Sequence, residues 1–388
     1  MKKLLFLAAL SSVALTSCVN EELENMETQQ ALKFDVPALS QTKANVLGEI
    51  DGTVYPAAEN FVVFCKSYKG AFAGWTNSTY STDYFAANGE VASNNATVGS
   101  TPAEGENTAS TGGSKYWATD IVHYWPEAEY NLAFAAYSPA VLTTLPTSIA
   151  HTVNGLQIED FKTESNADNQ YDLMYTSRVV DRNKGNNANK AVPLVFKHAL
   201  SSIVFSAQKA DETVDYVITD LKVKGRFHQT GNFNQNITES NNGGYSETEN
   251  TPTWTVPTET PDTITYDPSF TEFSVPANSP AQFTKGTSAL LLIPQVLPAD
   301  AHIVLTYNKI TYTNPNDKTQ GSKVMQATAN IPLSSFYQDE KDTSTGVSNF
   351  EIGTRYVFRI SFGQNTRIYF EPSIQNWQQE DTYIHTIL

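Results

Sequence analysis

The chain has few of the residues that form cross-links or metal sites. Among its 388 residues there are only two cysteines, Cys18 and Cys65, and six histidines. No two histidines have a spacing that would place both on one metal, and the HExxH, CxxC, Gly-x-Ser-x-Gly and phosphate-loop motifs are missing. The sequence therefore predicts neither a cofactor nor a metal, and it carries no signature of an enzyme.

Positive charge is also scarce. Lysine and arginine number 25 against 41 acidic residues, and the formal net charge is −16. A chain of this charge repels phosphate backbones and anionic lipid surfaces. Nucleic acid is therefore not expected as a partner.

Long apolar runs are missing except near the start, at residues 4–15. This run is shorter than the roughly 20 residues that a membrane-spanning helix needs. Lys2 and Lys3 precede it and small residues follow it, which is the layout of a secretory signal peptide. We assign residues 1–17 to a signal peptide.

Residues 15–18, Leu-Thr-Ser-Cys, resemble the bacterial lipobox, in which the cysteine thiol receives a diacylglyceryl group before cleavage. Cys18 would then be the lipidated first residue of the mature protein, and residues 18–30 its tether. The alternative is an ordinary signal peptide with a chance cysteine. With Cys18 lipidated, Cys65 has no partner for an intramolecular disulfide, so packing alone must stabilise the fold.

The composition favours strands over helices. Tyrosine and phenylalanine are abundant, methionine is scarce, and the apolar residues alternate rather than repeat every 3.6 positions. We expect an all-β, mostly antiparallel protein with strands in these ranges: 61–65, 130–137, 192–196, 202–207, 216–223, 289–294, 303–310, 324–331, 356–362 and 367–370. Two long polar stretches, 86–114 and 229–263, are expected to be loops, and the first to be disordered.

A third polar stretch, residues 181–190, interrupts the strand pattern near the middle of the mature chain. Domain boundaries fall in such segments. We therefore expect two domains, residues 31–190 and 191–388.

Single residues offer little chemistry. His198 and Cys65 each lie in an apolar run, which favours a hydrogen-bonded structural histidine and a buried small hydrophobe. The abundant carboxylates leave a glycosidase pair open, because its members need only meet in space. Trp75, in a Gly-Trp-Thr-Asn turn, is the candidate exposed aromatic for a sugar ligand, although tryptophans next to strand residues more often belong to the core.

Seven short segments together resemble the fimbrillin family of Mfa-like, type V pilins from Gram-negative anaerobes. In order, they are HYWP (123–126), LAFAAYSP (132–139), YDLMY (171–175), VFKHALS (195–201), LLIPQ (291–295), GTRY (353–356) and IQNW (374–377). The resemblance covers nearly all of the mature chain. It implies two transthyretin-like β-sandwich domains, export as an outer-membrane lipoprotein, and assembly into fimbriae.

In such pilins, a protease removes the lipidated segment together with the first strand, and a strand of the next subunit fills the groove. The resemblance places the displaced strand at Leu32, Phe34 and Val36, which share one face, and the cut after Lys43. Family members usually carry arginine there, so Lys43 is a departure. A groove exposed in this way recruits a strand from another chain.

The last seven residues, 382–388, are the candidate donor strand. Ile384 and Leu388 share one face, and Tyr383 and Ile387 share the other. Because neither face is cleanly apolar, the tail could equally pair within its own domain as a last edge strand.

The resulting functional expectation is an adhesive pilin or pilus-associated subunit whose partners are other pilin subunits. Before maturation it would be a surface lipoprotein of the cell outer membrane, and after polymerisation part of the fimbrium. The alternative is a lipoprotein that never polymerises, either a module for a host glycan or protein receptor or a tip or anchor subunit. An enzyme, a glycan hydrolase, is the third choice.

Overall fold

A computed structural model describes residues 31–36, 55, 59–75, 81–94, 117–142, 144–186, 191–240, 244–284, 288–339, 342–363 and 368–376. The regular structure of these residues consists of strands and two short 3-10 helices, η1 (Ala167–Asn169) and η3 (Leu333–Ser335). Apart from the parallel pairs β1–β11 and β13–β29, the strand pairs are antiparallel. The prediction of an all-β, mostly antiparallel fold is confirmed.

The first sheet has the order β11-β1-β5-β4-β2-β6-β9-β12, with β3 paired to β2 and β10 to β6. Its strands are β1 (Phe34–Asp35), β2 (Phe61–Lys69), β3 (Ser81–Asp83), β4 (Glu90–Asn94), β5 (Trp117–Thr119), β6 (Tyr130–Ser138), β9 (Met174–Thr176), β10 (Val179–Arg182), β11 (Val192–Pro193) and β12 (Phe196–His198). Only two residues separate β11 from β12, so the two ends of the sheet come back together and enclose a core.

The second sheet packs on the outer face of the first. Its order is β18-β15-β8-β7, and its strands are β7 (Ser148–Thr152), β8 (Gly155–Lys162), β15 (Thr230–Asn234) and β18 (Thr253–Thr255). A separate hairpin, β16 (Ile237–Ser240) and β17 (Ser246–Glu249), lies between β15 and β18 in sequence. Val62 and Phe64 of β2 pack in one cluster with Ile158 and Phe233 of this sheet, whereas Phe61 and Val63 face the enclosed core of the first sheet.

Two further sheets form a second sandwich. One has the order β21-β13-β29-β30, with β22 paired to β13; the other has the order β19-β14-β24-β25, with β20 paired to β14. The bounds are β13 (Ser201–Lys209), β14 (Val214–Gly225), β19 (Ile264–Tyr266), β20 (Phe273–Ser274), β21 (Ala281–Gln282), β22 (Leu290–Leu292), β24 (His302–Tyr312), β25 (Ser322–Pro332), β29 (Thr354–Phe362) and β30 (Ile368–Asn376). Two short pairs complete the fold: β23 (Gln295–Val296) with β28 (Asn349–Phe350), and β26 (Tyr337–Asp339) with β27 (Asp342–Gly346).

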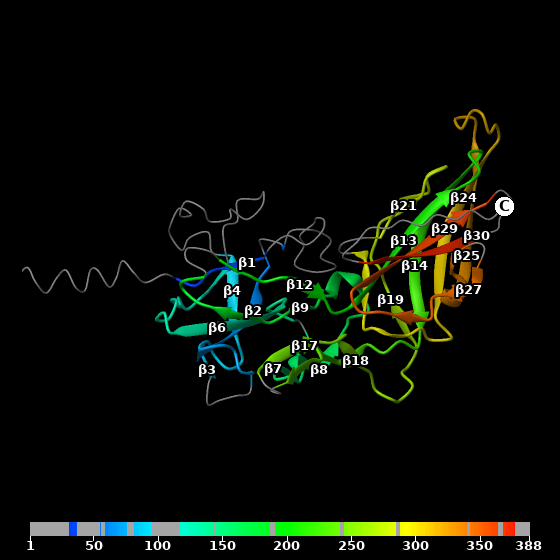
Figure 1. The fold of residues 1–388 in the computed structure, drawn as a ribbon. Helices are drawn as coiled ribbons and strands as arrows, with labels where there is room; N and C mark the ends of the chain where they lie inside the picture. Colours follow the sequence, from blue (N-terminus) through cyan, green and yellow to red (C-terminus); the bar gives the residue numbers. More distant parts are fainter. Residues whose placement is uncertain are drawn as a thin grey trace, which may run out of the picture.

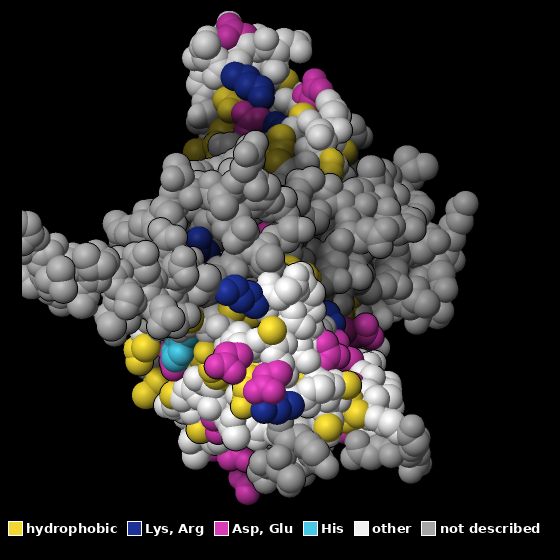
Figure 2. All heavy atoms as spheres, turned by 60° about the vertical axis from the view of Figure 1, so that its left-hand side comes forward, with side chains coloured by type: hydrophobic (Ala, Val, Ile, Leu, Met, Phe, Trp, Pro, Cys, Tyr) yellow, Lys and Arg dark blue, Asp and Glu magenta, His cyan; other side chains and the backbone are white. Residues whose placement is uncertain are grey.

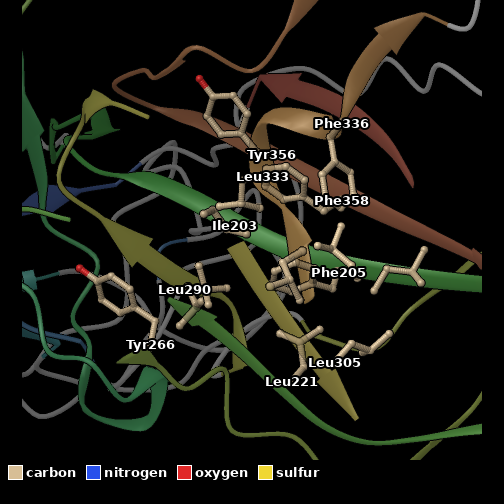
Figure 3. Packing of buried hydrophobic residues seen from close by; sticks show 14 of the residues in the cluster. Ile203, Phe205, Leu221, Tyr266, Leu290, Leu305, Leu333, Phe336, Tyr356 and Phe358 are labelled. Carbon is tan, nitrogen blue, oxygen red and sulfur yellow. The ribbon is translucent and has the colours of Figure 1, made fainter. Parts of the chain in front are cut away.

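Alternating side chains of the long strands fill this second core. Ile203 and Phe205 of β13 belong to one cluster with Leu221 of β14 and Leu305 of β24 (Figure 3). In the same view, Phe336 lies edge-on against Phe358, with ring centroids 4.8 Å apart. Figure 1 shows the first sheet at one end of the molecule and the strands of the second sandwich at the other.

The change of sheet does not coincide with the expected break at residues 181–190. The strands β11 and β12 follow that segment but still pair in the first sheet, with β1 and β9. Strands β15 and β18, from the predicted second domain, complete the second sheet by pairing with β8 and with each other. The division at residue 190 stays a prediction, and the strand pairing shows that segments after residue 190 complete both sheets of the first part.

Candidate functional site: the slot of the first strand

The first strand, β1, lies inside the first sheet and not at its edge. Phe34 pairs antiparallel with Trp117 of β5 and parallel with Val192 of β11. The Val192 backbone N–H donates to the Lys33 carbonyl at 2.7 Å. The short strand therefore joins two neighbours that would otherwise be separated by a gap, which we call the slot of the first strand.

Side chains of this segment alternate between the core and the surface. Leu32, Phe34 and Val36 are 3%, 0% and 5% exposed, whereas Lys33 and Asp35 are half-buried. The three residues proposed as a displaced strand thus all point into the core that the first sheet encloses. Burying each such side chain stabilises the fold by about 1.5–3 kcal/mol.

Phe34 is the centre of an aromatic group. Its ring meets those of Phe61, Phe85 and Phe134 at nearly right angles, with centroids 6.2, 6.3 and 5.6 Å apart. Edge-to-face pairs of this kind are worth about 0.5–1.5 kcal/mol each beyond area burial. Without β1, three aromatic side chains would face an empty slot.

Tyr55 and Trp117 form another wall of this core. The Tyr55 ring stacks on Phe196 at 5.0 Å, and its hydroxyl lies 2.6 Å from the Ser138 hydroxyl. The Trp117 Nε1–H donates to the Glu59 carbonyl at 3.0 Å. The backbone of Glu59 thereby holds the tryptophan that pairs with Phe34.

Two buried acids and a histidine lie beside this wall. Glu59 is 4% exposed, and its Oε1 has no hydrogen-bond partner. The His198 Nδ1 lies 3.0 Å from the Asp172 carboxylate, as expected of a structural histidine. Burial, and secondarily the charge of Asp172, raises the pKa of Glu59 to about 7.

Replacing Glu59 by glutamine is expected to flatten the pH dependence of stability. Because the folded-state pKa of Glu59 is raised, its ionisation removes stability as the pH rises from about 4.5 through about 7. At pH 8, Glu59→Gln should be more stable than the wild type by up to about 3 kcal/mol, and at pH 4.5 the two should be similar. Urea unfolding at both pH values measures this.

Other groups also make the stability of the wild type depend on pH, because burial raises the pKa of Asp35 and lowers that of His151. The quantity to compare at each pH is therefore the free energy of unfolding of Glu59→Gln minus that of the wild type. Glu127→Gln, on an exposed side chain, is the control and should shift stability equally little at both pH values. A Glu59→Gln difference that does not change between pH 4.5 and 8 would show that the fold does not raise the pKa of Glu59.

The expectation that Trp75 is an exposed aromatic is wrong. Its side chain is 5% exposed, and its Nε1–H donates to the His151 carbonyl at 2.8 Å. The His151 ring packs on it with centroids 4.5 Å apart. Trp75 belongs to the core between the first and second sheets.

Cys65 is 3% exposed and lies in the core enclosed by the first sheet. Burial raises the pKa of its thiol well above the usual value, so it is a packed side chain without thiolate reactivity.

Several predicted positions lie outside the described residues: Cys18, Lys43, Tyr383, Ile384, Ile387 and Leu388.

Sequence reasoning missed a buried charge network around Arg178, whose side chain is 0% exposed. Its guanidinium contacts Glu239, lies 3.4 Å from the Glu247 Oε2, and donates to the Val153 carbonyl at 2.6 Å. The Tyr245 hydroxyl lies 3.0 Å from both glutamates. Its members come from three separate parts of the sequence, at residues 153, 178 and 239–247, so no local pattern could have indicated it.

Within the described residues, no group of three or more His, Cys, Asp and Glu side chains is placed to hold a metal ion. Across the same ranges, no helix has the length and apolar character needed to cross a membrane.

Comparisons with known proteins bear on this arrangement. The model of the fimbrillin-like family matches residues 72–377, which is most of the chain. The chain belongs to the fimbrillin-like family. No curated protein matches the sequence of this fimbrillin-like protein.

Solved structures match most of this chain. A fimbrial protein from Bacteroides vulgatus is 16% identical with a TM-score of 0.56, and the match covers 90% of this chain and 99% of that one. The tip fimbrial protein Mfa3 from Porphyromonas gingivalis is 8% identical with a TM-score of 0.33, and the match covers 90% of this chain and 100% of that one. The first likeness shows that the fimbrillin-like protein shares its fold with a fimbrial protein.

Proposed function

We propose that this fimbrillin-like protein is a pilus-associated adhesion subunit, exported as a lipoprotein and assembled by donor-strand exchange. The observation that carries the proposal is the position of β1 between β5 and β11. Its main chain bonds to neighbours on both sides, yet only Phe34 and Asp35 have strand geometry. The segment has only two residues in strand geometry, while its apolar side chains are deeply buried. Such a segment can be removed and replaced by a strand of another subunit.

Removal of β1 would leave main-chain groups without partners on both sides of the slot. The Val192 and Leu194 N–H groups, which donate to the Lys33 and Asp35 carbonyls at 2.7 and 2.8 Å, would need new acceptors. An incoming strand supplies such acceptors and fills the side-chain pockets as well. The slot therefore fits an extended segment from another subunit, and the fold of the fimbrial relative is consistent with that role.

The proposed cut after Lys43 and the proposed donor tail make assembly testable. Digestion with a lysine-specific protease should release the first strand and yield oligomers, whereas Lys43→Gln should stay uncut there and monomeric. Mass spectrometry of the new N-terminus and size-exclusion chromatography measure both steps. Oligomers formed equally by Lys43→Gln would contradict this maturation site.

Deletion of residues 382–388 should abolish these oligomers but leave the Tm of the uncut monomer nearly unchanged. A donor strand contributes to the neighbour's slot, whereas an intrinsic edge strand would contribute to the stability of its own domain. A large loss of monomer stability, or assembly without the tail, would overturn the donor role. Either result would favour the non-polymerising surface lipoprotein.

The burial of Trp75 removes the aromatic platform on which a glycan-binding version of that alternative depended.

Cys18→Ala should abolish fatty-acid labelling and membrane association, because Cys18 is the residue proposed to carry the anchor. Cys65→Ala is the matched control and should keep both, since the Cys65 thiol is buried. Metabolic labelling with a radioactive fatty acid, followed by membrane fractionation, measures the effect. Unchanged labelling in Cys18→Ala would end the proposal of a lipid anchor.

A further inference from the structure

The loop between β5 and β6 carries exposed apolar side chains. Ile121, Val122 and Tyr124 are 64%, 45% and 40% exposed, and Val91 of β4 is 38% exposed. Figure 2, which brings the end of the first sheet forward, shows hydrophobic side chains gathered around a histidine. We call Ile121, Val122 and Tyr124 the apolar loop patch.

Polar contacts hold this loop in place. The Thr119 hydroxyl donates to the Ile121 carbonyl at 2.7 Å, and the His123 Nε2 lies 2.9 Å from the Glu90 carboxylate. The His123 ring also packs on Phe85 with centroids 4.4 Å apart. The loop is anchored through its polar groups, while its apolar side chains point outward.

The described chain begins beside this patch. Ala31 bridges Tyr124, and the Leu32 N–H donates to the His123 carbonyl at 2.8 Å. Ala31 lies only 13 positions after Cys18 in the sequence. Even fully extended, this segment reaches no more than about 45 Å. Figure 1 shows β1 at the end of the molecule away from the strands of the second sandwich, so a lipid on Cys18 would hold this end toward the membrane.

We propose that the apolar loop patch docks on the lipid surface to which Cys18 anchors the protein. The proposal rests on the lipid anchor proposed above. Aliphatic side chains next to a tyrosine suit the boundary between acyl chains and headgroups. The patch is small, so the contact depends on the high local concentration that the tether creates. The full chain has a formal net charge of −16, which becomes more negative when the signal peptide with Lys2 and Lys3 is removed, and this favours a zwitterionic over an anionic surface.

A single fluorescent label tests the docking. With Cys18 lipidated and Cys65 buried, a cysteine introduced at position 121 is the one reactive thiol. Full-length lipidated Ile121→Cys, carrying an environment-sensitive fluorophore, is incorporated into phosphatidylcholine vesicles that contain nitroxide-labelled lipid. The emission should shift to the blue and be quenched. Val324→Cys on β25, where the native side chain is 57% exposed, is the control and should show neither effect.

A second variant separates docking from mere proximity. Val122→Ser combined with Tyr124→Ser should reverse the blue shift and the quenching at position 121, although the tether is unchanged. Labels at 121 and 324 that behave alike, or a signal that survives the double substitution, would overturn the docking alone. A wild-type protein that does not float with the vesicles would overturn the lipid anchor and this proposal with it.

Discussion

Replacing Phe34 by alanine is expected to lower the free energy of unfolding by about 3–5 kcal/mol. The side chain is fully buried, and its loss leaves Phe61, Phe85 and Phe134 without their shared edge-to-face partner. The surrounding core is enclosed by the first sheet and can collapse only partly into the space. Urea unfolding of the uncut protein, followed by tryptophan fluorescence, measures the change.

Lys33→Ala is the matched control because Lys33 lies on the same segment with a half-buried side chain on the opposite face. Its cost should be at most about 1 kcal/mol. If Phe34→Ala costs no more than Lys33→Ala, the first strand does not contribute to the core in solution. The slot would then have no hydrophobic driving force to offer a donor strand.

The long alternating strands could be predicted from the sequence for a physical reason. In β2 and β6, successive side chains face two different cores, and in β13 and β29 most side chains are buried. Apolar, β-branched and aromatic residues must therefore dominate these stretches. The same requirement makes Leu32, Phe34 and Val36 visible as one buried face.

The polar stretch at 229–263 was expected to be a loop and instead contains β15, β16, β17 and β18. Its buried apolar side chains are few: Phe233 and Ile237 are 2% exposed, and Trp254 packs against the same cluster as Phe233. The strands form because β15 pairs with β8, about 70 residues earlier in the chain. A local pattern carries no signal of such a partner, so composition alone favoured a loop.

The polar composition of residues 181–190 predicts a boundary between domains. Their described part forms a tight turn, in which the Asn183 and Asn186 side chains each accept a hydrogen bond from the other's backbone N–H at 2.9 Å. Asparagine-rich turns and flexible linkers share a composition. Only the pairing of β11 and β12 shows that the first sheet continues beyond this turn.

Replacing Arg178 by alanine is expected to cost about 3–5 kcal/mol of stability, because breaking a buried ion pair leaves the remaining charge uncompensated. Glu239 and Glu247 have side chains only 8% and 20% exposed. The guanidinium carbon also lies 5.0 Å from the centre of the Trp75 ring, a cation–π contact that alanine removes. Urea unfolding at pH 7 measures the loss.

Arg226→Ala is the matched control, since Arg226 faces Asp300 at 3.9 Å with both side chains exposed. Surface pairs of this kind contribute at most about 1 kcal/mol. Arg178→Lys should lie between the two, because lysine keeps the charge but lacks the planar fork that reaches two glutamates and the carbonyl groups of Thr152 and Val153. Equal losses for Arg178→Ala and Arg226→Ala would mean that the network does not hold the fold together.

The strands that lose stability in Arg178→Ala show whether Arg178 holds two parts of the molecule together or stabilises the whole fold. Arg178 and Glu239 fasten the β16–β17 hairpin, from the second half of the chain, against the segment at Trp75 and the β7–β8 turn in the first half. Hydrogen exchange in Arg178→Ala should therefore accelerate first in β16, β17 and β7, while β13 and β29, whose side chains pack in the second core, keep their protection. Exchange that accelerates equally in all these strands would show that Arg178 stabilises the whole molecule and not the joint between the two halves.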